Sequence, residues 1–222
     1  MAENSFKNVS TQPKVFFLLP VKTLFLLGGI FSAFFILIAG LVFFDYANSM
    51  DHAIFNFARS TPFNSSPILT LILQNIARLG SSQFVLPLSL LVGVFLSLYR
   101  RNLALGVWFV LSVILFEALL ESLKHLFTHF VQWLSHNANF PSATVLSLTL
   151  FYGLLVLLIP HFIAHKTLQN ILVYSLFGLI LLISLVLIVL GVSFSSVLGG
   201  FCLGALGACF SIGIYLSVFQ KI

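Results

Sequence analysis

Three titratable side chains share one face of a strongly apolar segment. Glu117, Glu121 and Lys124 follow one another at spacings of four and three residues, so a helix places them along one stripe. Ionisable groups inside a membrane-spanning helix are costly and usually face a protein interior, which makes them candidates for a functional site. The alternative is a structural role: a Glu–Lys pair that orders the end of the helix and, for Glu117, a protonated or hydrogen-bonded role in packing.

A histidine pair follows directly. His125 and His129 are four residues apart, the spacing that puts two metal ligands on one helix face. His136 comes later, in a segment expected to be a loop, and no third ligand stands at a metal-site spacing. The pair is therefore interpreted as polar histidines at a membrane interface, and the sequence predicts no metal site and no cofactor.

The composition places these residues in a membrane protein. The 222-residue chain is 60% hydrophobic and 7% charged, whereas soluble domains carry about 25% charged residues. Low hydrophobicity and high net charge would indicate disorder, and neither is present. The scattered Lys and Arg residues do not form the cluster typical of nucleic-acid binding. The sequence therefore predicts an all-α integral membrane protein.

Runs of about 20 apolar residues, each long enough to cross a bilayer, predict six transmembrane helices. Residues 45–82, between the first and second spans, are mixed in character and predict one or two short interfacial helices. Residues 1–22 are expected to form a cytoplasmic N-terminal segment and residues 23–220 a single membrane domain. The six predicted spans are residues 23–44, 84–99, 103–123, 143–160, 169–190 and 197–218.

The positions of the basic residues predict the orientation, because cytoplasmic loops carry an excess of Lys and Arg. With the N terminus inside, seven basic residues lie on the inner side and three on the outer side. The inner seven are Lys7, Lys14, Lys22, Arg100, Arg101, Lys166 and Lys221, and the outer three are Arg59, Arg78 and Lys124. Both termini are therefore expected to be cytoplasmic, with residues 124–142 and 191–196 outside, in a plasma membrane or bacterial inner membrane.

Residues 118–127 (ALLESLKHLF) and 139–143 (NFPSA) carry a family resemblance. Together with the segment that begins at Asp51, and with Leu190-Gly191-Val192 before a Gly-rich last helix, they resemble the type 2 phosphatidic acid phosphatases. This superfamily includes lipid phosphatases and vanadium haloperoxidases. The resemblance covers roughly residues 45–215 and implies a six-span phosphatidic acid phosphatase-like helical bundle.

The catalytic residues that the resemblance implies are mostly replaced. The family's first motif is a lysine followed after six residues by Arg-Pro; Lys124 matches, but Val131 and Gln132 stand at the Arg-Pro positions. An arginine found earlier in the family's loop falls near His129. The second motif, Pro-Ser-Gly-His, is reduced to Pro141-Ser142 followed by Ala143-Thr144.

The third motif retains none of its charged or titratable residues. Leu187 stands at its Arg position and Ser193 at its His position, and the Asp position falls at Val197, or at Ser196 with one deletion. In the family, the two histidines supply the nucleophile and the general acid, and Lys and Arg neutralise the phosphate. Residues 167–220 contain no His, Asp, Glu, Arg or Lys, so a shifted alignment does not restore these groups.

These departures favour a catalytically degenerate member of the superfamily that binds lipid, acts as a scaffold or serves as a subunit of a complex. No catalytic residue is predicted. Lys124, Ser142, His129 and Ser193 are the candidate contacts for an anion or lipid headgroup, and Pro141-Ser142 has a second interpretation as the start of the fourth span. Membrane lipids and other membrane proteins are the expected partners, and nucleic acid is not.

Two alternatives remain open at the sequence level. One is an active phosphatidate or isoprenyl phosphate phosphatase in which His125, His129 and His136 replace the missing groups. The other is a small transporter that uses the intramembrane acids Glu117 and Glu121. The Gly200–Gly204 step in the last span predicts close helix packing within the chain.

Overall fold

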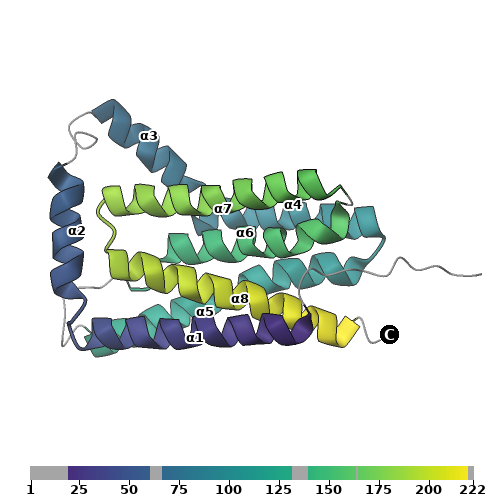
Figure 1. Cartoon of the computed structure of the whole chain (residues 1–222), viewed down its shortest axis with the longest axis horizontal. Helices are drawn as coiled ribbons and strands as arrows, with labels where there is room; N and C mark the ends of the chain where they lie inside the picture. Colours follow the sequence, from purple (N-terminus) through teal and green to yellow (C-terminus); the bar gives the residue numbers. More distant parts are fainter. Residues whose placement is uncertain (1–19, 61–66, 132–139, 164, 220–222) are drawn as a thin grey trace, which may run out of the picture.

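A computed structural model describes residues 20–60, 67–131, 140–163 and 165–219, apart from the side chains at 100, 127–131 and 161. The described residues form eight α-helices and no strand, which confirms the predicted fold class (Figure 1). The helices are α1 (Val21–Phe43), α2 (Asn48–Ser60), α3 (Pro67–Arg78), α4 (Ser82–Arg100), α5 (Leu103–Val131), α6 (Ala143–Phe162), α7 (Lys166–Val189) and α8 (Phe194–Phe219).

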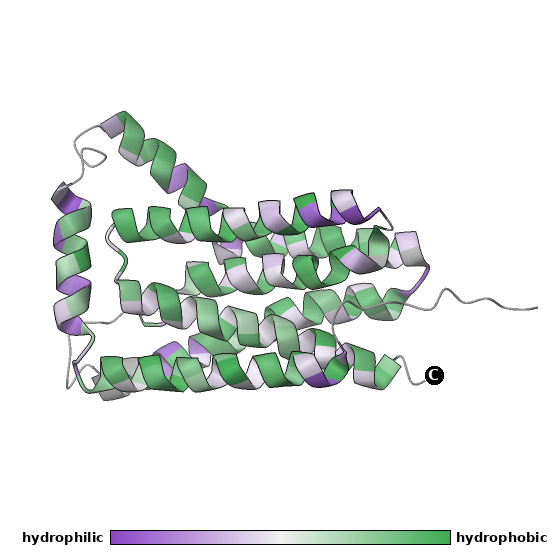
Figure 2. Ribbon diagram, viewed as in Figure 1, coloured by the Kyte–Doolittle hydropathy of each residue, from purple (hydrophilic) through white to green (hydrophobic). Residues whose placement is uncertain are grey.

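Six of these helices are long and apolar enough to cross a membrane: α1, α4, α5, α6, α7 and α8. They lie side by side, with apolar residues along most of their length and hydrophilic residues gathered on α2 and near the helix ends (Figure 2). The two short helices, α2 and α3, lie at the end of the bundle away from the C terminus (Figure 1). Each contains polar and apolar residues, as expected of the interfacial helices predicted between the first two spans.

The third span is longer than predicted. The sequence suggested that the span ends at residue 123 and that a polar stretch begins at 124, but α5 continues to Val131. Lys124, His125 and His129 therefore all lie on this helix. The polar residues after Leu123 do not interrupt the helix, because Lys and His are compatible with helical backbone and neither Pro nor Gly occurs before Val131.

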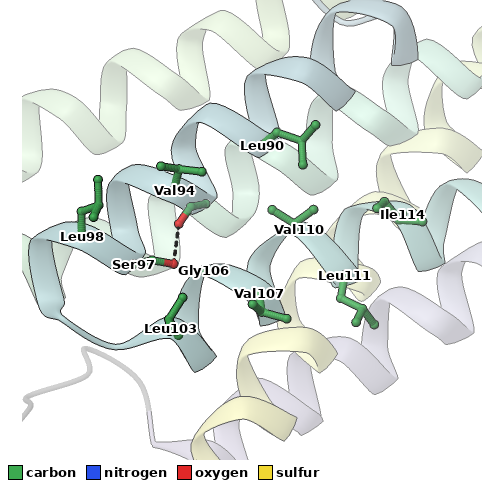
Figure 3. Close-up of a pocket in the computed structure, with 11 residues that line it drawn as sticks. Leu90, Val94, Ser97, Leu98, Leu103, Gly106, Val107, Val110, Leu111 and Ile114 are labelled. Atoms are coloured by element: carbon green, nitrogen blue, oxygen red, sulfur yellow. Dashed lines mark hydrogen bonds between the residues drawn. The ribbon is translucent and has the colours of Figure 1, made fainter.

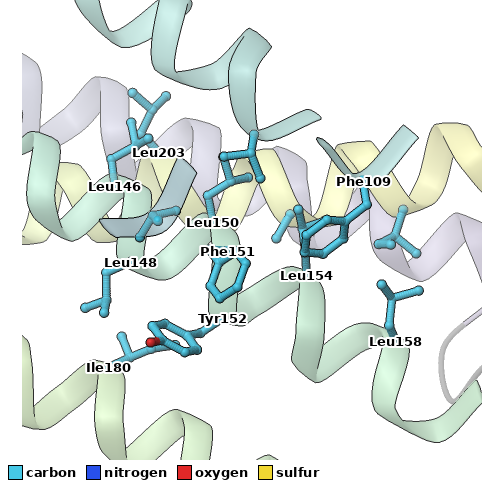
Figure 4. Packing of buried hydrophobic residues seen from close by; sticks show 14 of the residues in the cluster. Phe109, Leu146, Leu148, Leu150, Phe151, Tyr152, Leu154, Leu158, Ile180 and Leu203 are labelled. Atoms are coloured by element: carbon cyan, nitrogen blue, oxygen red, sulfur yellow. The ribbon is translucent and has the colours of Figure 1, made fainter. Parts of the chain in front are cut away.

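The helices α6 and α8 form the centre of the bundle. In their most apolar stretches, 56% and 67% of the residues are buried, compared with 11% in α1 at the periphery. Leu146, Leu150 and Phe151 of α6 pack in one cluster with Leu203 of α8 and Phe109 of α5 (Figure 4). The elements that position residues 142 and 193 are thus the most buried ones.

Small residues bring α6 and α8 into backbone contact. A Cβ atom added to Gly200 would lie 2.6 Å from the carbonyl oxygen of Ser142, and one added to Gly204 would lie 2.8 Å from that of Leu146. This confirms the close intramolecular packing predicted for the Gly200–Gly204 step. It also fixes the N-terminal ends of the two helices beside each other.

Candidate functional site

The beginning of α8 is built from serines. Ser193 directly precedes the helix, and its hydroxyl donates a hydrogen bond of 2.6 Å to the hydroxyl of Ser196 in the first turn. The turn that leads into it requires glycine, because Gly191 has a φ of +97°. The Leu190-Gly191-Val192 segment thus sets the direction of the chain as it enters α8. Ser195 and Ser196, expected in the break between spans, belong to the helix.

An acidic side chain from a distant helix covers this helix start. One carboxylate oxygen of Asp51, on α2, accepts a 2.9 Å hydrogen bond from the backbone N–H of Ser195, and the other accepts one of 2.6 Å from its hydroxyl. Asp51 is 6% exposed and Ser195 is 3% exposed. The first N–H groups of a helix lack partners within it and carry partial positive charge, so they favour an anion. Asp51 supplies that anion from within the chain.

The start of α6 lies against the same turn. The backbone N–H of Ser142 donates to the carbonyl oxygen of Ser196 at 3.0 Å, and Ser142 is buried at the position before the helix. Its side chain makes no capping hydrogen bond, so the position but not the side-chain interaction of a helix cap is present. The structure thus brings together Ser142, Ser193 and Ser196, which lie far apart in the sequence.

The remaining candidate contacts are described less fully. Lys124 is half-buried on α5. His129 lies on the same helix, but its side chain is outside the described part, and His136 falls within the undescribed residues 132–139. Among the residues described, no group of three or more His, Cys, Asp or Glu side chains could hold a metal ion. His125 is exposed.

The other two positions aligned with the third motif are apolar and buried. Leu187 is 7% exposed and Val197 is 4% exposed, and both belong to the main hydrophobic cluster. Neither side chain can bind a phosphate or orient a nucleophile. The hydrogen bonds described at this junction are made by serine hydroxyls, backbone groups and the Asp51 carboxylate.

A second polar cluster lies where α4, α5 and α6 meet. The Ser82 hydroxyl donates to Glu117 Oε2 at 3.0 Å, and Ser147 donates to Glu117 Oε1. The two serine hydroxyls lie 3.3 Å apart. These contacts agree with the hydrogen-bonded packing role predicted for Glu117. Glu121, one turn further along α5, is exposed.

Asp51, Ser195 and the Ser82–Ser147 pair were not among the predicted site residues. Asp51 had a detectable signal, because it is the single acidic residue of a short amphipathic segment and has to find a partner or remain in water. Ser195 lay in the predicted polar break but could not be distinguished from its neighbours. No sequence pattern linked Ser82 or Ser147 to Glu117.

The architecture defines a class: a six-span helical bundle with two interfacial helices after the first span and a polar junction at the start of the last. A scan against protein-family models found no match. Phosphatidylglycerophosphatase B of Bacillus subtilis (strain 168) is 26% identical over 179 residues, which cover 78% of this chain and 87% of that protein. Together with the fold, this similarity supports the resemblance to the type 2 phosphatidic acid phosphatase superfamily that the motifs predicted.

A solved structure has the same fold. The crystal structure of the first transmembrane PAP2 type phosphatidylglycerolphosphate phosphatase from Bacillus subtilis matches with a TM-score of 0.70 and 22% sequence identity. The match covers 88% of this chain and 98% of that one. At this identity the likeness establishes the fold, and the chemistry of this chain depends on its own residues.

Proposed function

We propose that the protein is a catalytically silent member of the superfamily that binds membrane lipids or supports a membrane complex. The observation that carries this proposal is the pairing of Asp51 with the start of α8. This helix end is where the family alignment places the residue that would accept the phosphoryl group. In this chain the helix end already holds a carboxylate, and the position of the nucleophile is Ser193.

Electrostatics support the proposal. A phosphate approaching the α8 N terminus would meet the negative charge of Asp51 and would compete with it for the Ser195 N–H. Like charges within a few ångströms repel each other, and the low dielectric of a buried site strengthens the effect. The family's arginines would offset this repulsion by bidentate binding, but apolar Leu187 and Val131 stand at two of their positions.

The replacement of the family's two catalytic histidines, the general acid and the nucleophile, also supports a catalytically silent protein. General acid catalysis alone contributes about 10²- to 10⁴-fold to a rate. Serine is a weak nucleophile without an adjacent base, and the Ser193 hydroxyl donates its hydrogen to Ser196. The second-motif histidine is replaced by Thr144.

The decisive experiment is a phosphatase assay on purified protein in nanodiscs, with phosphatidate and phosphatidylglycerol phosphate as substrates. The expected result is no phosphate release above that of the matched Lys124→Ala variant. An unrelated active lipid phosphatase in the same nanodiscs controls for substrate access. Turnover that Lys124→Ala abolishes would refute the proposal.

The specific observation that favours an active enzyme is the sequence similarity to a protein named phosphatidylglycerophosphatase B. That alternative predicts turnover that depends on His125, His129 or His136, so the same assay on the three His→Ala variants tests it. The transporter alternative requires a polar cavity that reaches both Glu117 and Glu121. Glu117 is hydrogen-bonded to Ser82 and Ser147, and Glu121 is exposed.

A further inference from the structure

The groove between α4 and α5 opens on the outer surface of the bundle, away from the junction of α6 and α8. It has a volume of about 410 Å³. Leu90, Val94 and Leu98 form one wall, and Val107, Leu111 and Ile114 contribute to the other (Figure 3). All six of these side chains are at least half exposed. Because the helix pair belongs to a membrane bundle, the groove faces lipid.

Close contact between the two helices forms the floor of the groove. A Cβ atom added to Gly106 would lie 2.2 Å from the carbonyl oxygen of Gly93 and 2.0 Å from the hydroxyl of Ser97. The Ser97 hydroxyl donates to the Gly93 carbonyl at 2.9 Å, so the polar group in the floor is satisfied within its own helix (Figure 3). The surface offered to an occupant is therefore apolar.

The length of the groove matches one leaflet of a bilayer. Along α5 it extends from Leu103 to Ile114, which at 1.5 Å per residue is about 16 Å. Half of the hydrocarbon core of a bilayer is about 15 Å. A single acyl chain, lying parallel to the helices, would thus have apolar contacts along its whole length.

A basic residue lies at one end of the groove. Arg101 is exposed in the turn between α4 and α5, and its backbone N–H bonds to the carbonyl of Leu98, a residue of the groove wall. Leu103, two residues later, lines the other side. Basic residues between membrane helices, near the membrane surface, can bind anionic lipid headgroups.

A second copy of the chain fits this surface less well. Membrane helices associate closely through small residues that let their backbones approach. Here the small residues Gly93 and Gly106 are already used in the contact between α4 and α5. A partner helix would meet a concave surface between branched side chains, which a flexible acyl chain fills more readily.

We propose that this groove is a binding site for one anionic phospholipid, with an acyl chain along α4 and α5 and the phosphate at Arg101. The site is separate from the α6–α8 junction and does not depend on whether the protein is an enzyme. It retains an anionic lipid in preference to a zwitterionic one.

The test is native mass spectrometry of the protein released from nanodiscs that contain equal amounts of phosphatidylglycerol and phosphatidylcholine with identical chains. We expect one retained lipid, mostly phosphatidylglycerol. Arg101→Gln should lower the preference about fivefold, the effect that corresponds to one basic residue at a membrane surface. Arg101→Lys should keep most of it, and Lys166→Gln, on a helix that does not line the groove, should leave it unchanged.

A substitution that fills the groove without changing the charge tests whether lipid retention depends on the groove itself. Val107→Trp should abolish lipid retention, whereas Ile171→Trp, at a similarly exposed position of α7, should not. Equal retention of both lipids by the unmodified protein would overturn the proposal. So would an unchanged preference in Arg101→Gln, an equal loss in Lys166→Gln, lipid retained in Val107→Trp, or a lipid-free dimer that Val107→Trp dissociates.

Discussion

Asp51 and Ser195 are 144 residues apart in the chain and joined by two hydrogen bonds at the start of α8. The contact ties α2 to the most buried helix of the bundle. It satisfies a backbone N–H and a hydroxyl that would otherwise be buried without a partner in this junction. The Asp51 carboxylate thus caps the N terminus of α8, although Asp51 belongs to α2.

Asp51→Asn should destabilise the protein by about 1–3 kcal/mol, because both bonds lose their charge assistance and the Ser195 hydroxyl has to turn from donating to the carboxylate to accepting from the amide. Thermal unfolding in detergent, followed by light scattering or intrinsic fluorescence, measures the effect. Asp45→Asn is the matched control, since Asp45 is an exposed residue that precedes the same helix. Equal melting temperatures for the two variants would contradict a stabilising role for Asp51.

The contact between α6 and α8 predicts a second stability difference. In Gly200→Ala the new methyl group would lie 2.6 Å from the Ser142 carbonyl oxygen, so one helix has to move. Such overpacking is destabilising by about 1–3 kcal/mol.

Gly178→Ala provides the control, because nothing lies within 4 Å of the added Cβ atom in α7. Alanine is the better helix former, by up to about 1 kcal/mol, so this variant should be as stable as the original protein or slightly more. A similar loss of stability in both variants would argue against close packing at Gly200.

The polar cluster at α4, α5 and α6 predicts a measurable coupling. A double-mutant cycle of Glu117→Ala and Ser147→Ala should give an interaction free energy of about 0.6–1.7 kcal/mol, the average and upper values found for hydrogen bonds between membrane helices. The same cycle with Glu121→Ala in place of Glu117→Ala should give a value near zero, because Glu121 is exposed. Equal coupling in both cycles would mean that the effect is not local to the Glu117–Ser147 bond.

The fold could be predicted from the sequence because a membrane-spanning helix needs a run of about 20 apolar residues, and such runs are visible in the sequence. Six membrane spans were expected, and six of the helices in the described residues are long and apolar enough to cross a membrane. Their ends differ by up to three residues from the predicted span ends, except that α5 continues to Val131. The exception has a physical reason. Lys124 and His125 mark where polarity rises, but Lys and His are compatible with helical backbone, and neither Pro nor Gly occurs before Val131.

The candidate site could be predicted from the sequence only in part. The number and order of the spans predicted that residues 142 and 193 would lie on the same side of the membrane, and the Ser142–Ser196 hydrogen bond shows that their helix starts meet. Asp51 could not be assigned to Ser195 without the packing of α2. The cluster around Glu117 forms because Ser82 of α4 and Ser147 of α6 face α5. The sequence could not predict which faces of α4 and α6 are buried, because these spans are almost uniformly hydrophobic.

The orientation of the bundle yields the last prediction. The start of α1, the turn between α4 and α5 and the start of α7 lie at one end of the bundle, and α2 lies at the opposite end (Figure 1). The first three carry Lys22, Arg101 and Lys166, and α2 carries Arg59. The positive-inside rule predicts that the first end is cytoplasmic. In a background with Cys202 and Cys209 changed to alanine, His52→Cys and His165→Cys place single exposed thiols at the two ends.

A membrane-impermeant thiol reagent added to intact cells should label His52→Cys and leave His165→Cys unlabelled until the membrane is permeabilised. The physical reason is that translocating the end that carries Lys22, Arg101 and Lys166 would move more basic residues across the membrane than translocating the end with α2 and α3. The reverse labelling pattern would place the Asp51–Ser195 junction in the cytoplasm. It would also place the anionic lipid groove in the opposite leaflet, without changing the residues that form either site.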